Sequence, residues 1–312
     1  RYRIGRNTMK QNWIYSLLVV IAASSYGVLS TIVKVAMQHG YTTAEAVTSQ
    51  YFFGFLMALL LFILTQRTLP NITKSGAVTL IFAGIFTALT GIVYGQSLNY
   101  LPASLAVVML FQFTWIGLFM NCFVNKRLPS RIELFSLAFL LAGTILAAGI
   151  IDVDLSQIAW QGWALGLAAA FTFAAFLQIN ARRVEGVTMI GRTFILSVIA
   201  LIVISIFLTP EIIWNGQLGT GLWKFGMALG LFGIILPILL FSIAAPKVGG
   251  ALVSILSAME LPVAIIVSVI VLKESLTIIQ VGGIILVLFG MVLPSYFAAK
   301  KMRTIDKKEK LT

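Results

Sequence analysis

Ten apolar segments, each near the length that crosses a bilayer, follow one another along the chain with short connections between them. A helix of about 20 residues spans the roughly 30 Å hydrocarbon core. The chain is 60% hydrophobic and only 10% charged, whereas a soluble domain carries about 25% charged residues. We therefore predict an all-α polytopic membrane protein with ten transmembrane helices, at 13–35, 44–65, 75–97, 102–124, 132–150, 160–180, 190–209, 221–243, 249–271 and 278–297.

Basic residues are concentrated in every second connection. With the N-terminus placed in the cytoplasm, 19 of the 22 lysines and arginines fall on the cytoplasmic side, the excess that cytoplasmic loops carry. We expect a multi-pass protein of the cytoplasmic (inner) membrane with both termini, the tails 1–12 and 298–312, in the cytoplasm. The net charge of +12 is then an insertion signal, and nucleic acid is not an expected partner.

The two halves of the chain correspond when the sequence is shifted by 147 residues. The shift places Trp13 on Trp160 and Gly143 on Gly290. We therefore predict two five-helix repeats, at 13–150 and 160–297. Because five is an odd number, consecutive repeats have opposite orientations in the membrane, and such inverted repeats recur in secondary transporters.

Several local sequences accompany this pattern: QSLNYLPASLA at 96–106, AAPKVGGALV at 244–253, the run ELP at 260–262 and the glycines of the last span. In these sequences and in its ten spans, the chain resembles the EamA branch of the drug/metabolite transporter superfamily. The resemblance covers nearly all of the chain between the tails. It implies a secondary transporter of a small metabolite, commonly an exporter, among families that carry amino acids, nucleosides, quaternary amines, sugars or drugs.

The chain departs from the family pattern at three places. The acid of the ELP run occurs in the second half alone, since the shift places Phe113 on Glu260. Lys126 and Arg127 follow span 4, where similar proteins often carry an acid, and Gln50 occupies a position at which many have arginine. Charge-based recognition by those residues is therefore not carried over to this chain.

Glu260 lies near the middle of an apolar span, two residues before Pro262. A carboxylate at this depth costs about 2.5–3.5 kcal/mol on insertion scales, which makes it a candidate functional residue. Ser257 and Ser254 precede it at helical spacing and share its face. One hypothesis is a substrate-binding or proton-coupling site along this polar stripe. The alternative is structural: a protonated Glu260 bonds to backbone that Pro262 leaves unpaired, where the carbonyl of Ala258 loses its donor.

Other polar side chains recur at helical spacing within the spans. We predict that they line a substrate path, although serine and threonine often return hydrogen bonds to their own helix. The candidates are Tyr26 and Ser30 of span 1, Thr90 and Tyr94 of span 3, and Gln112 and Trp115 of span 4. The Trp115 ring would stack on an aromatic or quaternary-amine ligand, or else pack between helices. The candidate gate residues are Lys34, for which snorkelling to the outer surface is the alternative, and Gln178 and Asn180 at the inner end of span 6.

No catalytic constellation is present in the sequence. One histidine, His39, and one cysteine, Cys122, exclude a multi-histidine metal site and a disulfide, so no metal or cofactor is expected. The expected partners are a small-molecule substrate, the lipid bilayer and, if Glu260 exchanges a proton, protons. The chain is expected to act as a monomer or a homodimer.

These observations favour a secondary active transporter for a small neutral, zwitterionic or cationic metabolite, with amino acids and related compounds first and export as the direction. The near-absence of charge within the spans argues against an anionic substrate. The alternatives are efflux of multiple cationic drugs, and a non-transporting membrane receptor, scaffold or intramembrane enzyme. An enzyme would need a second ionisable group near Glu260, and no span supplies an evident one.

Overall fold

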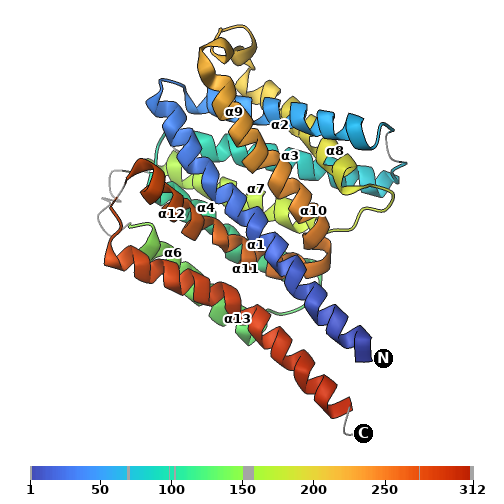
Figure 1. Cartoon of the computed structure of the whole chain (residues 1–312). Helices are drawn as coiled ribbons and strands as arrows, with labels where there is room; N and C mark the ends of the chain where they lie inside the picture. The colour runs from blue at the N-terminus through green and yellow to red at the C-terminus, as the bar shows by residue number, and fades with distance from the viewer. Residues whose placement is uncertain are drawn as a thin grey trace.

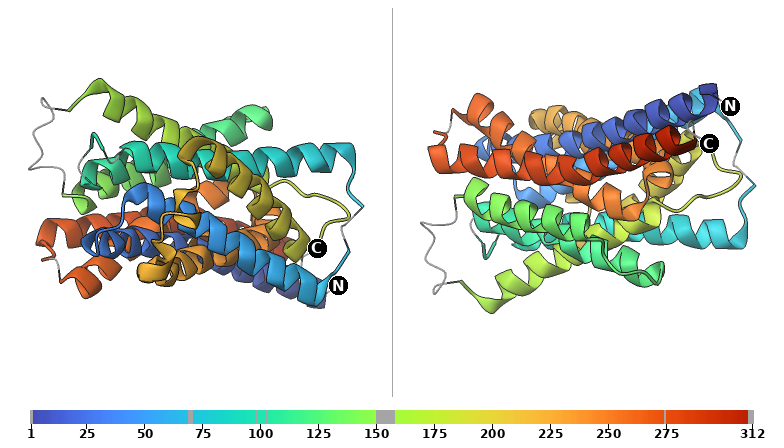
Figure 2. Two further views of the ribbon diagram at one scale, coloured as in Figure 1. Left: turned by 90° about the horizontal axis from the view of Figure 1, so that it is seen from above. Right: turned by 90° about the horizontal axis from the view of Figure 1, so that it is seen from below.

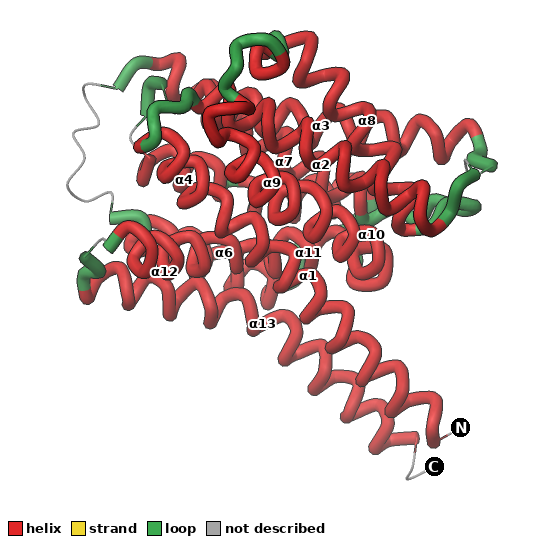
Figure 3. Tube along the Cα trace, turned by 45° about the horizontal axis from the view of Figure 1, so that its top comes forward, coloured by secondary structure: helices red, strands yellow, loops and turns green. Residues whose placement is uncertain are grey.

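The computed structural model describes residues 2–68, 71–97, 99–101, 103–149, 158–273 and 275–309, with side chains between 13 and 297 apart from 103 and 104. Within these ranges the chain is helical and contains no strand (Figures 1 and 3). The end of the first predicted repeat, at residue 150, and the last three residues of the C-terminal tail lie outside the described residues.

The helices follow one another as α1 (Tyr2–Gln38), α2 (Thr43–Thr65), α3 (Lys74–Ser97), α4 (Ala103–Phe111), α5 (Phe113–Val124), α6 (Arg131–Ala147), α7 (Trp160–Asn180), α8 (Met189–Leu208), α9 (Trp223–Gly230), α10 (Leu236–Val248), α11 (Gly250–Leu256), α12 (Glu260–Leu272) and α13 (Ile278–Glu309). Two 3-10 turns, η3 (Glu211–Ile213) and η6 (Ser257–Met259), and two π turns, η4 (Leu218–Leu222) and η5 (Leu231–Ile235), connect or interrupt them.

Nine helical segments of the described chain are long and apolar enough to cross a membrane. They are Trp13–Gln38, Thr43–Thr65, Lys74–Ser97, Leu105–Val124, Trp160–Asn180, Met189–Leu208, Leu218–Val248, Gly250–Leu272 and Ile278–Phe297. The remaining predicted span, 132–150, corresponds to α6, which has 17 residues and ends at Ala147. The prediction of an all-α polytopic membrane protein is therefore confirmed.

Both chain termini lie at the same end of the helix bundle (Figures 1 and 2). We call this the termini end, and the opposite end, with the α1–α2 and α12–α13 connections, the far end. α1 packs along α10 and α12, α2 along α8 and α9, α3 and α5 along α7, and α6 along α13. Each of these pairs joins a helix of the first half to one of the second, so the halves interlock rather than form separate domains.

The packed core draws on helices of both halves, among them α1, α3, α4, α5, α7, α8 and α10. Its largest fully buried side chains include Phe111, Phe113, Phe176 and Phe241. On the outer surface, by contrast, Phe123 is 86% exposed. Exposed apolar surface of this kind is unusual in a soluble monomer and is covered by lipid in a membrane.

Two spans are interrupted at corresponding places. α4 ends at Phe111 and α5 begins at Phe113. α11 ends at Leu256, the η6 turn follows, and α12 begins at Glu260. Phe113 and Glu260 are the two residues that the shift of 147 superposes. Each break therefore precedes the same position of the two aligned halves.

Pro262 lies just after the second break. As the third residue of α12 it is in the first turn, where backbone N–H groups have no partner within the helix. The Glu260 N–H is directed at the carbonyls of Ser257 and Ala258. Pro262 has no N–H, so the Ala258 carbonyl lacks its usual donor four residues on, and the Glu260 N–H is directed at it within the 3-10 turn instead.

α1 crosses directly over the break. A Cβ added to Gly27 of α1 would lie 2.5 Å from the carbonyl oxygen of Glu260 and 3.0 Å from the Cβ of Val263. A residue without a side chain permits this close approach of two helix backbones. The contact joins the two halves of the chain at the depth of Glu260.

Candidate functional site

Glu260 and Ser257 form the polar centre of the α11–α12 break. Ser257 is fully buried, and its Oγ has no hydrogen-bond partner among the described residues. Within the same part of the chain, Glu260 Oε2 is also buried without a partner. An unpaired buried polar group costs roughly 1–3 kcal/mol. A ligand that supplies hydrogen bonds to these two atoms would remove that cost.

Aromatic side chains surround this centre. Tyr26 of α1 stacks on Phe241 of α10 with ring centroids 6.1 Å apart, and it meets Phe173 of α7 edge-on at 5.7 Å. Tyr26 and Tyr94 of α3 lie within electrostatic range of Glu260. The structure therefore places two predicted tyrosines, from separate helices of the first half, in the neighbourhood of the carboxyl of the second half.

Tyr51 of α2 belongs to the same centre and is not among the residues predicted from the sequence. It is buried, interacts electrostatically with Tyr26, and donates a hydrogen bond of 2.8 Å from its hydroxyl to the Thr87 carbonyl. Its place at the end of the polar run Thr48–Gln50 within the second span was the available signal. Tyrosines of α1, α2 and α3 thus converge near Glu260.

Thr90 lies one turn from Tyr94 on α3, but its hydroxyl is engaged elsewhere. It donates a hydrogen bond of 2.8 Å to the Phe86 carbonyl of its own helix and lies 3.0 Å from Thr172 Oγ1 of α7. Thr172 in turn bonds to the Ala168 carbonyl at 2.9 Å. Both hydroxyls thus donate hydrogen bonds to carbonyls of their own helices, the alternative considered for threonines within the spans. The contact between the two hydroxyls joins α3 to α7.

Ser30 and Lys34 continue along α1 toward the far end, and both are half-buried. Thr31 lies beside Ser30 and was not predicted. Its hydroxyl is buried and has no hydrogen-bond partner within the described chain. The polar side chains of α1 therefore extend from Tyr26 toward the far end, and the gate role of Lys34 stays a prediction.

Gln112 and Trp115 face each other, as their spacing indicates. Trp115 Nε1 donates a hydrogen bond of 2.7 Å to Gln112 Oε1, while Gln112 Nε2 donates to the Val108 carbonyl at 3.0 Å. Trp115 also lines an open apolar groove of about 620 Å³ between α5 and α7. The groove is formed by Trp115, Ile116, Phe119, Met120, Phe123, Leu167, Ala168 and Phe171. Trp115 also packs against the main core and against the cluster that contains Cys122.

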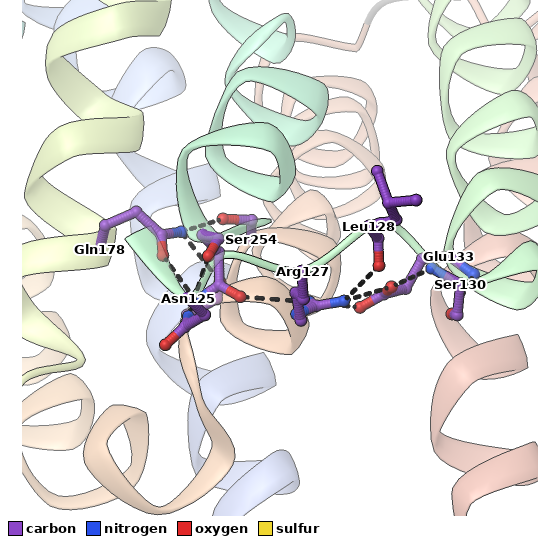
Figure 4. Close-up of polar contacts among 9 residues, drawn as sticks. Asn125, Arg127, Leu128, Ser130, Glu133, Gln178 and Ser254 are labelled. Atoms are coloured by element: carbon purple, nitrogen blue, oxygen red, sulfur yellow. Dashed lines mark hydrogen bonds and ion pairs between the residues drawn. The ribbon is translucent and has the colours of Figure 1, made fainter. Parts of the chain in front are cut away.

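A second polar cluster links α5, α7 and α11 with the connection that precedes α6 (Figure 4). Gln178 Nε2 of α7 donates hydrogen bonds to Ser254 Oγ at 2.9 Å and to the Gly250 carbonyl at 3.0 Å, both on α11. Asn121 Nδ2 of α5 donates to Gln178 Oε1 at 3.3 Å. Ser254 shares a helical face with Glu260 in the sequence, but its described partner is Gln178.

Arg127 and Glu133 extend this cluster to the start of α6. The Arg127 guanidinium binds both carboxylate oxygens of Glu133, at 2.8 and 2.9 Å, and donates to Asn121 Oδ1 at 3.1 Å. The hydrogen bond to Glu133 raises the pKa of Arg127. Glu133 also accepts the Ser130 N–H at 2.7 Å, in the capping box that begins α6. Neither Asn121 nor Arg127 is predicted from the sequence, where Arg127 counts only as a charge that sets topology.

Asn180, the other gate candidate of α7, lies apart from Gln178. It is fully buried, and neither polar atom of its side chain has a partner among the described residues. Its carbonyl accepts a hydrogen bond of 2.9 Å from Arg192 Nη2. Residues two apart on a helix point to different sides, so the side chains of Gln178 and Asn180 contact different parts of the molecule.

The Glu260 centre has the groups for binding. A carboxyl and a hydroxyl together accept and donate hydrogen bonds, and the carboxyl also exchanges a proton or balances a positive charge. Within the described ranges, no group of three or more His, Cys, Asp or Glu side chains is placed to hold a metal ion. The arrangement fits recognition of a small polar solute.

Residues 160–296 match the model of the EamA-like transporter family. No curated protein matches the chain significantly. Among solved structures, the chain is similar to one described only as the crystal structure of a protein, with a TM-score of 0.70 and 12% identity over 93% of this chain and 98% of the other. At this identity the likeness concerns the fold alone.

Proposed function

We propose that this chain, whose residues 160–296 match the EamA-like transporter family model, moves a small neutral, zwitterionic or cationic metabolite by alternating access. The family consists of membrane transporters of small solutes, and the substrate, direction and mechanism are our inference. Amino acids and related compounds are the first substrate class, and export is the direction. The observation that carries the proposal is a pair of buried atoms, Glu260 Oε2 and Ser257 Oγ, that have no hydrogen-bond partner in the described part of the chain.

The proposed substrate class follows from the groups around that pair. Glu260 supplies the carboxyl, and the tyrosines in its neighbourhood, Tyr26 and Tyr94, supply hydroxyls and aromatic faces. An ammonium or neutral amino group on the substrate would pair with the carboxyl, whereas a lone anionic group would be repelled by its charged form. A zwitterion satisfies the site by directing its amino end toward Glu260.

The helix pairing supports alternating access between two inverted repeats, 13–150 and 160–297. Under the shift of 147, the packing of α1 on α12 corresponds to that of α7 on α5, and the packing of α2 on α9 corresponds to that of α8 on α3. α6 and α13 correspond to each other and pack together. Two halves related in this way can exchange inward-open and outward-open roles around one central site.

We place the termini end in the cytoplasm, on the distribution of basic residues. Gln178 and its partners then lie at the cytoplasmic end of the bundle and Lys34 at the outer end, each suited to a gate. The Glu260 centre is built within one chain, so a monomer suffices for the proposed transport, and a homodimer would hold two such centres.

Efflux of cationic drugs is a second candidate, favoured by the aromatic rings near Glu260. The stacked faces of Tyr26 and Phe241 and the edge contact to Phe173 form an aromatic wall beside a carboxyl. Such walls attract organic cations by about 0.5–2 kcal/mol per contact. This candidate predicts that several unrelated cations bind at the same site.

A thermal-shift screen of the purified protein against metabolites and cationic drugs tests the proposal. A ligand that binds the folded state at 100 times its Kd stabilises it by about 2.7 kcal/mol. We expect amino acids or related compounds to raise the unfolding midpoint of the wild type more than that of Glu260→Gln. Glu185→Gln, at an exposed loop position, is the matched control. Stabilisation by anions alone, or equal stabilisation of wild type and Glu260→Gln, would contradict the assignment.

A further inference from the structure

Arginine side chains donate hydrogen bonds and never accept them. Arg127 Nη2 lies 3.1 Å from the Asn121 side chain, so the atom that faces it must be an oxygen. The amide group of Asn121 must then direct its NH₂ the other way, toward Gln178. One guanidinium therefore sets the orientation of an amide that could otherwise face either way.

The same constraint passes on to Gln178. Because Asn121 presents NH₂, Gln178 must present Oε1 to it and direct its own Nε2 toward α11. The Gly250 carbonyl on α11 can only accept, so Nε2 is the group that it requires. If the Asn121 amide were reversed, its NH₂ would face the Arg127 guanidinium, donor against donor. Gln178 would then have to reverse as well, and the Gly250 carbonyl would lose its donor.

We infer that Arg127, held by Glu133, is a positioning residue that sets the direction of the hydrogen-bond chain from Asn121 through Gln178 to Gly250, and that this chain latches α5 and α7 to α11 at the termini end. Asn121 and Arg127 belong to the first half, whereas Gln178 and Gly250 belong to the second. The latch therefore joins the halves. That it acts as a gate rests on the proposed alternating access.

Close helix packing surrounds the latch. A Cβ at Gly250 would overlap Gln178 Oε1, and a Cβ at Gly117 of α5 would overlap Ser254 Oγ. Glycine at these two positions lets the helix backbones approach until the amides meet. Separation of α11 from α5 and α7 must break both hydrogen bonds that Gln178 donates to α11 together, which gives the latch two distinct states.

Cys122 provides a built-in reporter of these states. It is the one cysteine of the sequence, it follows Asn121 directly, and only 4% of its surface is exposed. It packs in a cluster with Ala251, the residue after Gly250. Leu137 of α6 belongs to the same cluster. We expect that movement of α11 away from α5 uncovers the thiol to a small maleimide, so the rate of modification reports opening of the latch.

The experiment measures the rate at which maleimide modifies Cys122 in the purified full chain, without substrate. In Arg127→Lys the ammonium group can only donate hydrogen bonds, so it still requires the oxygen of Asn121. In Arg127→Gln the amide can present either its NH₂ or its oxygen to Asn121. We expect Arg127→Gln to raise the rate roughly tenfold, the size of effect that loss of one charge-assisted hydrogen bond produces. Arg127→Lys should raise it less. Arg131→Gln, at an exposed position four residues away, should leave it unchanged.

Two further measurements keep the inference open to contradiction. Asn121→Asp keeps the contact to Arg127 but cannot donate to Gln178, so it should also accelerate modification. Unfolding midpoints of all variants separate local opening from loss of the fold. Equal rates in wild type, Arg127→Gln and Asn121→Asp would overturn the latch, and equal rates for Arg127→Lys and Arg127→Gln would overturn the role of Arg127. Because no substrate is used, these outcomes are independent of the proposed function.

Discussion

The two hypotheses for Glu260 place different demands on one oxygen atom. A structural role requires the carboxyl to bond to backbone that Pro262 leaves unpaired. In the fold, the Glu260 N–H already serves the carbonyls of Ser257 and Ala258, and Oε2 is buried with no partner among the described residues. This arrangement favours a ligand over the backbone as the partner of the carboxyl.

Two substitutions of Tyr26 distinguish the contribution of its ring from that of its hydroxyl. Tyr26→Phe keeps the contacts to Phe241 and Phe173 and loses the hydrogen bond of its hydroxyl to Thr87, so the free energy of unfolding should fall by no more than about 1 kcal/mol while ligand stabilisation falls. Tyr26→Leu loses aromatic pairs worth about 0.5–1.5 kcal/mol each and should lower the midpoint as well. Thermal unfolding with and without ligand measures both effects. A wild-type ligand response in Tyr26→Leu would remove Tyr26 from the site.

Single residues differ in how far the sequence could predict them. Glu260 is conspicuous because a carboxyl interrupts an apolar span, and Gln178 because an amide ends one. Asn121 and Arg127 acquire their roles from each other and from Gln178, 57 residues from Asn121 in the chain. A hydrogen bond between residues so far apart depends on helix pairing, which hydropathy does not encode.

At the scale of elements, the break before α12 depends on α1 as much as on Pro262. Gly27→Ala would place a Cβ 2.5 Å from the Glu260 carbonyl oxygen, and such overpacking costs typically 1–3 kcal/mol. We expect a lower unfolding midpoint and weaker ligand binding, because α1 must move away from the break.

Gly282→Ala on α13 is the matched control, since an added Cβ there meets nothing within 4 Å. Exchange of glycine for alanine in an open helix stabilises by up to about 1 kcal/mol, so its midpoint should be equal to or above that of the wild type. A midpoint for Gly27→Ala as high as that of the control would show that α1 tolerates displacement from the break.

The start of α6 has two supports that can be separated. Ser130→Ala removes the capping hydroxyl that accepts the Glu133 N–H at 3.2 Å, at a cost of about 1 kcal/mol. The Arg127–Glu133 ion pair does not include this hydroxyl, so the unfolding midpoint should fall while Cys122 modification stays at the wild-type rate. Thr42→Ala at the equivalent capping box of α2 is the control for stability. Faster Cys122 modification in Ser130→Ala alone would mean that the cap supports the latch.

At the scale of the whole molecule, span number and helical class follow from local properties, because bilayer thickness sets a length that each apolar segment meets by itself. The interlocking of α1 with α12 and α7 with α5 involves residues far apart in the chain, and the alignment at 147 residues predicts which positions correspond but not which helices touch. The same limit explains why Tyr26 and Glu260 could be chosen separately but not paired.

The orientation of the molecule has a direct test in a Cys122→Ala background. A membrane-impermeant maleimide added to intact cells should label a cysteine at His39, exposed at the far end, but not one at Arg183, exposed at the termini end. This result follows if the basic connections remain in the cytoplasm. Labelling at position 183 and not at 39 would reverse the assignment of both ends.

The most direct test of the account is transport in proteoliposomes, with the solute identified by thermal shift, measured over a pH series for wild type, Glu260→Gln and Glu185→Gln. Glutamine cannot release a proton, so we predict that Glu260→Gln loses pH-dependent and gradient-driven transport while Glu185→Gln keeps both. A Glu260→Gln variant with the wild-type rate and the wild-type pH dependence would contradict the central role given to this carboxyl.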